Sequence, residues 1–530
     1  MGLKRDTLRH SAIYSVANVL GRMASFVMLP FYAYLFEAKG YGIIALIDAS
    51  IGFLSVGIAA GSHNAILRTY HDERPERKGL VISSGIWTVW MFSALCVPIP
   101  ALASPWISEL LLGSSGYWML ILLALGTFLF DMGGQSASTF LVIRQQSLLY
   151  SAVNLLQLLL GLTLNIVLVV ILRVGLVGIF VSSLIATGVA SLIFHLAAVR
   201  AHGLAYDPVI GRRLRRYWFP LVPGELVAYV SRQVERYLVR FLVSLEGVGI
   251  LEMAYKFPPL INLFIAHPFL RAWRTKSMEI GPQPDAPREI GSMFTLFAFL
   301  TLFAAVILAG TIGPLIEILA PPDFAPASGI ARIEIGTTVA AAGTNYLMFG
   351  LLYAGRTGTI TRIRSASAVV KVCLSTVLIL WAGLAGAAWS ALVMEVLVML
   401  WMFRCSQQVF RVNLEYGKLA LLGGLAVGLT VAIDASSIWG AGLLSSIERA
   451  FDSDVVGALG QTAVAHWRDG RVLEMVRERA YAFAHLLVGG TVSLLYISAI
   501  LVIRPQLAHW PDRHFVRPVV RVLRAIVGRP

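Results

Sequence analysis

Apolar residues occur along this chain in long runs that short polar segments separate. A hydrocarbon layer about 30 Å thick needs about 20 apolar residues, because an α-helix rises about 1.5 Å per residue. The runs of this length predict about 14 transmembrane helices, with the eleventh and twelfth joined by a tight hairpin at 383–385. The predicted spans lie near residues 11–36, 42–66, 80–104, 117–141, 151–172, 176–199, 218–244, 249–270, 291–316, 328–354, 365–382, 386–403, 419–437 and 483–503.

The composition agrees with an all-α polytopic membrane protein. Hydrophobic residues make up 57% of the chain and charged residues 14%, which is too apolar for soluble domains of this length. The three cysteines, Cys96, Cys373 and Cys405, lie far apart and form no C-x-x-C pair. We therefore expect no metal site and no cofactor. The sequence also has no nucleotide-binding glycine motif, so transport driven by ATP on this chain alone is not expected.

Lys and Arg are unevenly distributed between alternate loops. If the amino terminus is inside, the inside segments hold most of the 43 basic residues, with clusters in 68–78, 200–216, 271–288 and 504–529. The short outside loops keep Lys39 and Arg173. Because positive charges near span ends stay in the cytoplasm, both termini are predicted to be cytoplasmic. This topology accounts for the net charge of +14 without nucleic-acid binding.

Two polar segments near the carboxyl end are predicted to be membrane anchors rather than active sites. Residues 438–480 form a longer outside loop with the pattern of an amphipathic helix on the outer face. The basic tail, 504–530, contains an amphipathic stretch in which Arg517, Arg521 and Arg524 share one face. That stretch suits anionic lipid at the cytoplasmic surface.

The seventh predicted span carries the most unusual charge. A charged side chain at the bilayer centre costs about 3 kcal/mol, so each one needs a partner or a wet cavity. Either acids such as Glu225 and Glu235 neutralise the arginines of this span, or the arginines line a water-filled cavity for an anionic, phosphate-bearing ligand, which a guanidinium suits. At about 100° per residue, one helix face about 80° wide holds Glu225, Tyr229, Arg232, Arg236 and Arg240.

Other intramembrane charges leave similar alternatives open. Lys256 lies one turn after Glu252, so it either extends this cationic face or pairs with Glu252. Arg22, in the first span, either forms an ion pair with Asp48 or Asp131, in the second and fourth spans, or faces a shared cavity with them.

Glu395 stands alone near the middle of the twelfth span. An isolated intramembrane carboxyl group either exchanges protons during transport or stays hydrogen-bonded with no role in coupling. Together with Asp131 and Asp48, Glu395 is a candidate for coupling transport to H⁺ or Na⁺.

A short internal repeat predicts two halves. Residues 35–49 align without a gap to 242–256, so that Gly40 and Gly42 match Gly247 and Gly249. Each copy lies near the start of six spans, which is how many transporters are built. We predict a six-helix N-lobe (1–205), a six-helix C-lobe (206–405) and two further helices (406–530).

Four segments, in this order and spacing, carry a family resemblance. They are SAIYSVANVLGRMASFVMLPFYAYLFEAKGYGIIAL, WFPLVPGELVAYVSRQVERYLVRF, GVGILEMAYKFPPL and YAGRTGTITRIRSASAVV, within residues 8–405. The chain resembles the Wzx-type oligosaccharide-lipid flippases of O-antigen and exopolysaccharide synthesis, in the multidrug/oligosaccharidyl-lipid/polysaccharide superfamily. Members often carry Asp-Arg-Tyr where this chain has Glu235, Arg236 and Tyr237, which keeps the charge but changes the acid.

The resemblance implies a transporter in the inner membrane of a bacterium, rather than an enzyme. Two lobes in a V would enclose a central cationic cavity, through which an undecaprenyl-pyrophosphate-linked oligosaccharide crosses from the cytoplasmic to the periplasmic leaflet by alternating access. The expected partners are this lipid-linked substrate, membrane lipids, and the polymerase and export machinery of lipopolysaccharide or exopolysaccharide. The residues expected to bind the substrate are Arg232, Arg236, Arg240, Arg22 and Lys256.

Two other functions compete with this one. An ion-coupled multidrug exporter of the same superfamily often carries cationic substrates, so acids rather than arginines should dominate its cavity. A membrane-embedded polysaccharide polymerase or ligase should place its arginines in large periplasmic loops. The intramembrane position of the three arginines favours the flippase over both.

Overall fold

The computed structural model describes residues 2–431, and the side chains of these residues except 2–25, 27 and 60. Every regular element in this part of the chain is helical, which confirms the predicted all-α class. Within it, nine helices are long and apolar enough to cross a membrane. The protein is therefore a multi-pass membrane protein.

Two of these helices each contain two spans. α1 (Gly2–Asp72) has 71 residues and α16 (Thr357–Val409) has 53. A straight helix of 53 residues would be about 80 Å long, far more than a bilayer needs. α1 turns at Glu37, where φ is 54°, and α16 turns at Gly383, where φ is 57°. The turn at Gly383 confirms the hairpin predicted at 383–385.

The remaining helices follow the predicted spans closely. α9 is not among the nine candidate spans because five charged residues interrupt its apolar sequence. The helices are α2 (Lys78–Cys96), α3 (Pro98–Leu102), α4 (Ser104–Leu112), α5 (Trp118–Ile143), α6 (Ser147–Asn165), α7 (Leu176–His202), α8 (Pro208–Trp218), α9 (Val222–Leu242), α10 (Leu245–Tyr255), α11 (Pro259–Ile261), α12 (His267–Ile280), α13 (Ala286–Leu319), α14 (Pro326–Leu347) and α15 (Phe349–Tyr353).

The carboxyl-terminal predictions are only partly covered. A shorter apolar helix, Tyr416–Val431, lies where the thirteenth span (419–437) was predicted to begin. The fourteenth span (483–503), the amphipathic segment 438–480 and the basic tail 504–530 lie outside the described residues.

The described chain forms two compact units. Unit 1 contains residues 2–256, 319–330 and 358–394, and unit 2 contains residues 257–318, 331–357 and 395–431. The lobe boundaries at 205 and 405 remain predictions.

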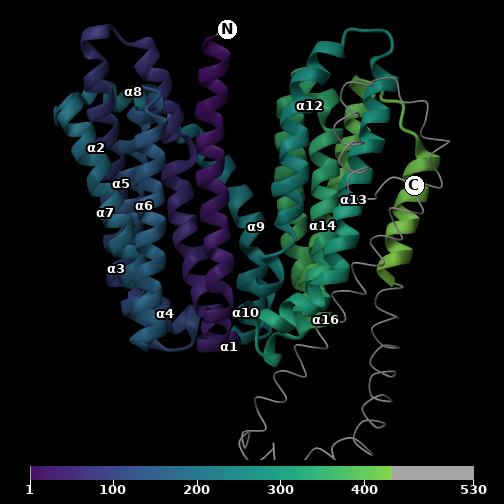
Figure 1. Ribbon diagram of the computed structural model, residues 1–530, viewed down its shortest axis with the longest axis horizontal. Coiled ribbons are helices and arrows are strands. Elements are labelled where there is room, and N and C mark those ends of the chain that lie inside the picture. Colours follow the sequence, from purple (N-terminus) through teal and green to yellow (C-terminus); the bar gives the residue numbers. More distant parts are fainter. Residues whose placement is uncertain (1, 432–530) are drawn as a thin grey trace, which may run out of the picture. The chain divides into compact units, whose positions relative to one another are not determined.

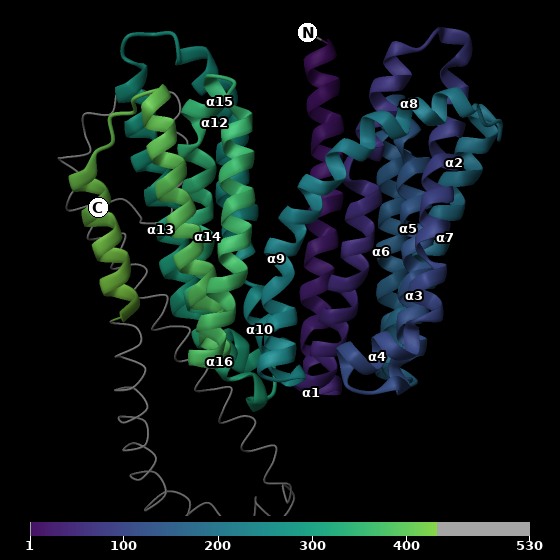
Figure 2. The same ribbon diagram turned by 180° about the vertical axis from the view of Figure 1, so that it is seen from behind.

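Apolar side chains between neighbouring helices hold unit 1 together. Figures 1 and 2 show α2, α5, α6 and α7 running alongside one another. Phe128 of α5 and Trp218 of α8 are each 1% exposed in one cluster, and Phe140 and Phe194 are buried in a second. Burying such rings contributes much of the packing energy of a helical unit.

Unit 2 packs around Tyr346 of α14. Its ring stacks on that of Trp273 with centroids 6.0 Å apart, and Phe297 lies against it at 5.4 Å. Its hydroxyl donates a hydrogen bond to the carbonyl oxygen of Ile290 at 2.9 Å, so the buried polar group is satisfied. Figures 1 and 2 show α12, α13 and α14 side by side in this unit.

The two copies of the sequence repeat, 35–49 and 242–256, contact each other in the structure. A Cβ on Gly42 would come within 3.0 Å of the carbonyl oxygen of Leu245, and a Cβ on Gly249 within 3.0 Å of the carbonyl oxygen of Ala38. In the repeat alignment Gly42 corresponds to Gly249, and Ala38 to Leu245. Each copy therefore makes the same contact with the other, as two copies related by a two-fold axis do. Only glycine permits so close an approach of two helices.

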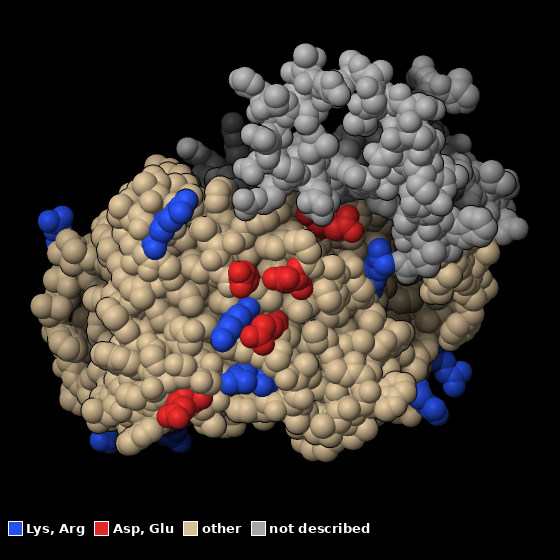
Figure 3. All heavy atoms as spheres, turned by 90° about the horizontal axis from the view of Figure 1, so that it is seen from below, with Lys and Arg blue, Asp and Glu red and all other residues tan. Residues whose placement is uncertain are grey.

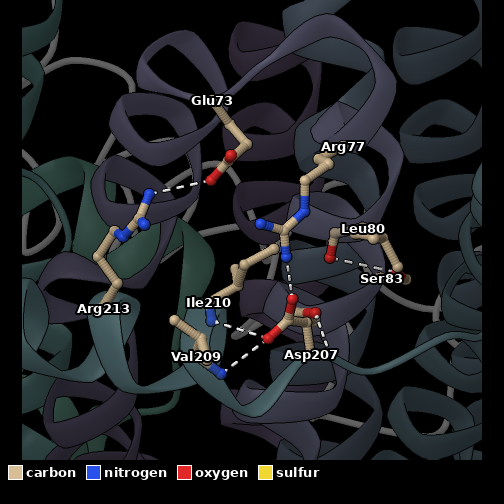
Figure 4. Close-up of polar contacts among 9 residues, drawn as sticks. Glu73, Arg77, Leu80, Ser83, Asp207, Val209, Ile210 and Arg213 are labelled. Atoms are coloured by element: carbon tan, nitrogen blue, oxygen red, sulfur yellow. Dashed lines mark hydrogen bonds and ion pairs between the residues drawn. The ribbon is translucent and has the colours of Figure 1, made fainter.

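The basic connecting helix α8 is attached to the turn between α1 and α2. Its amino end is capped by Asp207, whose carboxylate accepts the backbone N–H of Val209 at 2.8 Å and pairs with Arg77. Arg213 pairs with Glu73 at 2.9 Å (Figure 4). The two ion pairs join helix segments about 130 residues apart in sequence.

Charged side chains are sparse on the face shown in Figure 3, where most visible atoms belong to uncharged residues. Many large apolar side chains of the described residues are well exposed, such as Trp106 at 74%, Trp381 at 83% and Ile99 at 77%. Exposed apolar residues of this size are expected on surfaces that face lipid.

Candidate functional site

The arginines predicted to form a cationic face lie on α9. Pro223 near its first turn is compatible with a helix start, and the helix ends just before Ser244, whose hydroxyl accepts the backbone N–H of Gly247 and caps α10. Arg232, Arg236 and Arg240 are spaced by four residues, so they follow one another along the same side of α9. The structure gives each of them different partners.

Arg236 is paired inside unit 1. Its side chain is 14% exposed, its Nε donates to Oε2 of Glu252 at 2.8 Å, and its Nη2 lies 2.6 Å from the same oxygen. The second oxygen of Glu252, Oε1, lies 3.3 Å from Nζ of Lys256. Glu252 of α10 therefore bridges two cations, Arg236 of α9 and Lys256 directly after the end of α10.

A second ion pair lies next to the first. Glu235 is 2% exposed; its Oε1 lies 3.0 Å from Nζ of Lys371, and its Oε2 accepts the hydroxyl of Tyr255 at 2.9 Å. The Arg236 guanidinium lies 5.5 Å from the centroid of the same tyrosine ring. The direct ion pair of Glu235 is thus with Lys371 of α16, while the neighbouring Arg236 of α9 pairs with Glu252.

The other two arginines point elsewhere. Arg232 is exposed, with its guanidinium 5.8 Å from the Tyr229 ring centroid. Nε of Arg240 donates to the carbonyl oxygen of Leu111, near the end of α4, at 2.5 Å. Glu225, a predicted neutralising acid, is exposed, and the described residues give it no ion pair.

A polar cavity of about 760 Å³ lies within unit 1, between helices that cross the membrane. This volume is in the range of cavities that hold small ligands, about 300–1,000 Å³. Lys256, Glu252 and Asp48 line it, whereas the three α9 arginines do not. The other side chains around it that can form hydrogen bonds are Tyr32, Tyr41, Thr127, Tyr150, Asn154, Gln157, Asn165, Ser183 and Thr187.

Many polar groups of the cavity wall are already partly satisfied. The hydroxyl of Tyr32 donates to Oδ1 of Asn165 at 2.7 Å, and Nε2 of Gln157 donates to Oγ1 of Thr187 at 3.1 Å. These contacts fix the orientation of the amides while leaving further donors and acceptors for a bound molecule. The cavity can therefore accept a strongly hydrated group.

The predicted coupling acids lie in different environments. Asp48 is exposed to the cavity of unit 1 and has no hydrogen bond or ion pair among the described side chains. Asp131 accepts Nε2 of Gln135 at 2.9 Å and does not line the cavity. Glu395, in unit 2, accepts the hydroxyl of Thr344 at 3.0 Å. Arg22, a predicted partner of Asp48 or Asp131, lies outside the described side chains.

Two features of the site were missed in the sequence. Lys371 lies in the eleventh predicted span, and an intramembrane lysine is itself a sign of a buried partner. The amides Asn154, Gln157 and Asn165 on α6 are spaced by three and eight residues, which places them near one helix face. Both signals could be read from the sequence: a lysine inside an apolar span, and three amides spaced to share one helix face.

Comparisons with known proteins identify relatives of this chain. A family described as "Polysaccharide biosynthesis protein" matches residues 7–273, half of the chain. No curated protein matches it. Among solved structures, the lipid II flippase MurJ in an inward closed conformation is 14% identical, with a TM-score of 0.67, and the match covers 93% of this chain and 98% of that one.

Two further solved structures have the same fold. One is an inward-facing multidrug resistance MATE family transporter of the MOP superfamily, 13% identical, with a TM-score of 0.61 and coverage of 76% and 95%. The other is a MOP superfamily transporter from Pyrococcus furiosus, 12% identical, with a TM-score of 0.53 and coverage of 78% and 96%. At such identities the similarity establishes the fold alone, which is that of MOP-superfamily transporters.

Proposed function

Because this chain belongs to the polysaccharide biosynthesis protein family, we propose that it translocates an undecaprenyl-pyrophosphate-linked oligosaccharide repeat unit. The direction is from the cytoplasmic to the periplasmic leaflet, and the mechanism is alternating access. The family and the superfamily fold predicted from the sequence are both confirmed. The likeness to the lipid II flippase supports a lipid-linked substrate of the same kind.

The observation that carries the proposal is the polar cavity of unit 1. A lipid carrier can leave its polyprenyl tail in the bilayer, but its pyrophosphate and sugars must cross the hydrocarbon layer, where an unpaired polar group costs several kcal/mol. A cavity of about 760 Å³ lined by hydroxyls and amides, with Lys256 and the acids Glu252 and Asp48 as its charged groups, offers such a head group hydrogen bonds in place of water.

We propose that the intramembrane cations contact the pyrophosphate at successive stages. Arg232 is exposed, and the described residues give its guanidinium no ion pair; Lys256 lines the cavity with its side chain 37% exposed. Arg236, Arg240 and Arg22 complete the proposed set. Guanidinium groups bind phosphate oxygens through paired hydrogen bonds, which favours arginine for this task.

The test is leaflet exchange in proteoliposomes. The purified protein is reconstituted with a fluorescent lipid-linked oligosaccharide, and exchange is followed by quenching from one side. Alanine at position 232, 236 or 240 should slow exchange about tenfold or more, because a hydrogen bond to a charged group contributes about 1.5–3 kcal/mol. Lysine at the same position should restore part of the rate.

Arg200→Ala is the matched control, since Arg200 is an exposed arginine of α7 in the same unit. It should exchange the substrate at the wild-type rate. Undiminished exchange in all three alanine variants would refute the proposed role of the α9 arginines.

Ion coupling is proposed at Glu395, with Asp131 and Asp48 as further candidates. Glu395→Gln keeps the size of the side chain and its hydrogen bond from Thr344 but cannot change charge. It should abolish the dependence of exchange on an imposed H⁺ or Na⁺ gradient. If Glu395→Gln proteoliposomes respond to both gradients as the wild type does, Glu395 has no coupling role.

A second candidate function is ion-coupled export of a cationic drug. It is favoured by Asp48, which exposes an unpaired carboxylate to the cavity among the described side chains, and by the likeness to a MATE transporter. Gradient-driven efflux of a cationic dye from the same proteoliposomes, without exchange of the lipid-linked oligosaccharide, would favour this function over the first.

A further inference from the structure

The carboxylate of Glu252 is held by cations on both of its oxygens. Oε2 faces the Nε and Nη2 of Arg236, at 2.8 and 2.6 Å, and Oε1 faces Nζ of Lys256 at 3.3 Å. Two cations that converge on neighbouring oxygens of one anion are the arrangement that binds a phosphate group. The position is already occupied by an anion of the protein's own chain.

We infer that Glu252 is a built-in competitor: its carboxylate occupies a phosphate-binding position formed by Arg236 and Lys256, and a phosphate or pyrophosphate group arriving through the cavity displaces it. The inference rests on the proposed function in one respect, because that function supplies the pyrophosphate. The chemistry applies to any ligand that carries a phosphate.

The cavity gives the ligand a path to this position. Glu252 and Lys256 both line the cavity of about 760 Å³, so a ligand inside it meets the carboxylate and the ammonium group directly. Arg236 lies behind the carboxylate, with its side chain 14% exposed. When the carboxylate turns away, both cations face the ligand and the displaced carboxylate stays in the polar cavity.

Glu235, the acid next to Arg236 in sequence, has no access to the cavity and is held by other partners. The Glu235 side chain is 3% exposed and does not line the cavity; Lys371 and the hydroxyl of Tyr255 hold its two oxygens. It lies on the same helix as Arg236 and adjoins it in sequence. Of these two buried acids, only Glu252 can be displaced by a ligand that comes from the cavity.

Competition by Glu252 solves two problems of a transporter. An unpaired Arg236 inside the membrane would be strongly destabilising before the ligand arrives, so a resident anion is needed. Transport also requires that the ligand leave, and exchange of one anion for another keeps binding weak enough for release. A bare cation pair would bind the pyrophosphate too tightly.

The test measures pyrophosphate binding to the full-length purified protein in detergent, by titration calorimetry with inorganic pyrophosphate and with undecaprenyl pyrophosphate. Glu252→Gln, which keeps the shape but removes the competing charge, should bind both probes about tenfold more tightly than the wild type, or tighter still. Glu235→Gln is the matched control. It removes the same charge one residue from Arg236, but from an acid that does not line the cavity and pairs with Lys371, so its affinity should stay within about twofold of the wild type.

Two further variants guard against misfolding. Arg236→Gln combined with Glu252→Gln removes both partners of the pair and should lose the gain in affinity. Glu252→Asp keeps the charge but shortens its reach, so it should give an intermediate gain even if Glu252→Gln is unstable. The inference is overturned if Glu252→Gln and Glu252→Asp bind pyrophosphate no more tightly than the wild type, or if Glu235→Gln gains as much as Glu252→Gln.

The binding test and the leaflet-exchange test can fail independently, so failure of this inference can be told apart from failure of the proposed function. A gain in pyrophosphate affinity in Glu252→Gln, without any leaflet exchange of the lipid-linked oligosaccharide by the wild type, would support the phosphate site and reject the proposed cargo. Normal exchange by the wild type, without a gain in Glu252→Gln, would reject the competitor alone.

Discussion

The contact between the two repeat copies makes a quantitative prediction for Gly249→Ala. The added methyl group would meet the carbonyl group of Ala38 at less than 3.0 Å, and the backbone nitrogen of Gly42 lies 3.0 Å away. Both are backbone atoms, so no side chain can rotate away to make room. α10 and α1 must move apart to accept the methyl group.

The expected loss follows from two opposing effects. Overfilling a well-packed contact costs about 1–3 kcal/mol. Alanine in a helix interior is favoured over glycine by up to about 1 kcal/mol, which works in the other direction. The net destabilisation is therefore about 1–2 kcal/mol. Gly42→Ala should cost a similar amount, and the double variant should cost less than both together, because helices already separated accept the second methyl group easily.

The assay is the apparent melting temperature in detergent, followed by tryptophan fluorescence and by the fraction that stays monodisperse after heating. Gly57→Ala is the matched control, because it lies in the same long helix α1 and a Cβ there meets nothing within 4 Å. This control should melt at or slightly above the wild-type temperature. If Gly249→Ala also melts at or above that temperature, the close contact is not what holds the two copies together.

Two further predictions concern single side chains. Asp207→Asn should lower the melting temperature at pH 7. The pKa of Asp207 is lowered chiefly by the backbone N–H of Val209 and further by Arg77, so its contribution is complete above the ordinary pKa of about 4 and is lost below it. The difference between variant and wild type should therefore stay constant from pH 7 down to about pH 4 and narrow below it, and a gap that widens at low pH would contradict this. Lys371→Met should destabilise unit 1 by about 3–5 kcal/mol by leaving Glu235 buried without its cation, and adding Glu235→Gln should restore much of the loss. A double-mutant cycle in denaturant should give a clear coupling, and additive losses would contradict the pair.

Hydropathy was sufficient to predict most of the fold. Spans are long apolar segments whose backbone must satisfy its own hydrogen bonds, so their number and limits follow from local sequence. The hairpin at Gly383 was also predictable, because the apolar run over 365–403 is too long for one span and contains a glycine that permits a tight turn. The thirteenth span shows the same agreement as far as residue 431.

The partners of the charges could not be predicted in the same way. A helical wheel places Arg232, Arg236 and Arg240 on one face, but their positions extend over about 12 Å along α9 and meet different neighbours. Arg236 meets an acid of α10, and Arg240 meets the carbonyl of Leu111, over 100 residues earlier in the chain. Such contacts depend on which helices are adjacent, and periodicity within one helix does not contain that information.

The repeat explains why the cavity lies where it does and why its chemistry is not repeated. Gly42 and Gly249 bring α1 and α10 together, and Glu252 follows Gly249 by three residues, while Asp48 follows Gly42 by six. The contact therefore places both carboxylates at one cavity. Yet in the repeat alignment Asp48 corresponds to Tyr255, and Lys256 to an alanine. The backbone contact is two-fold symmetric, whereas the charged residues are not. The cavity at this contact therefore receives Lys256 and the displaceable acid Glu252 from the second copy, and from the first copy Asp48, which has no ion pair among the described side chains. Asp48→Asn removes the unpaired acid of the first copy without touching the contact between Gly42 and Gly249, so we expect this variant to melt near the wild-type temperature while exchanging the lipid-linked oligosaccharide more slowly.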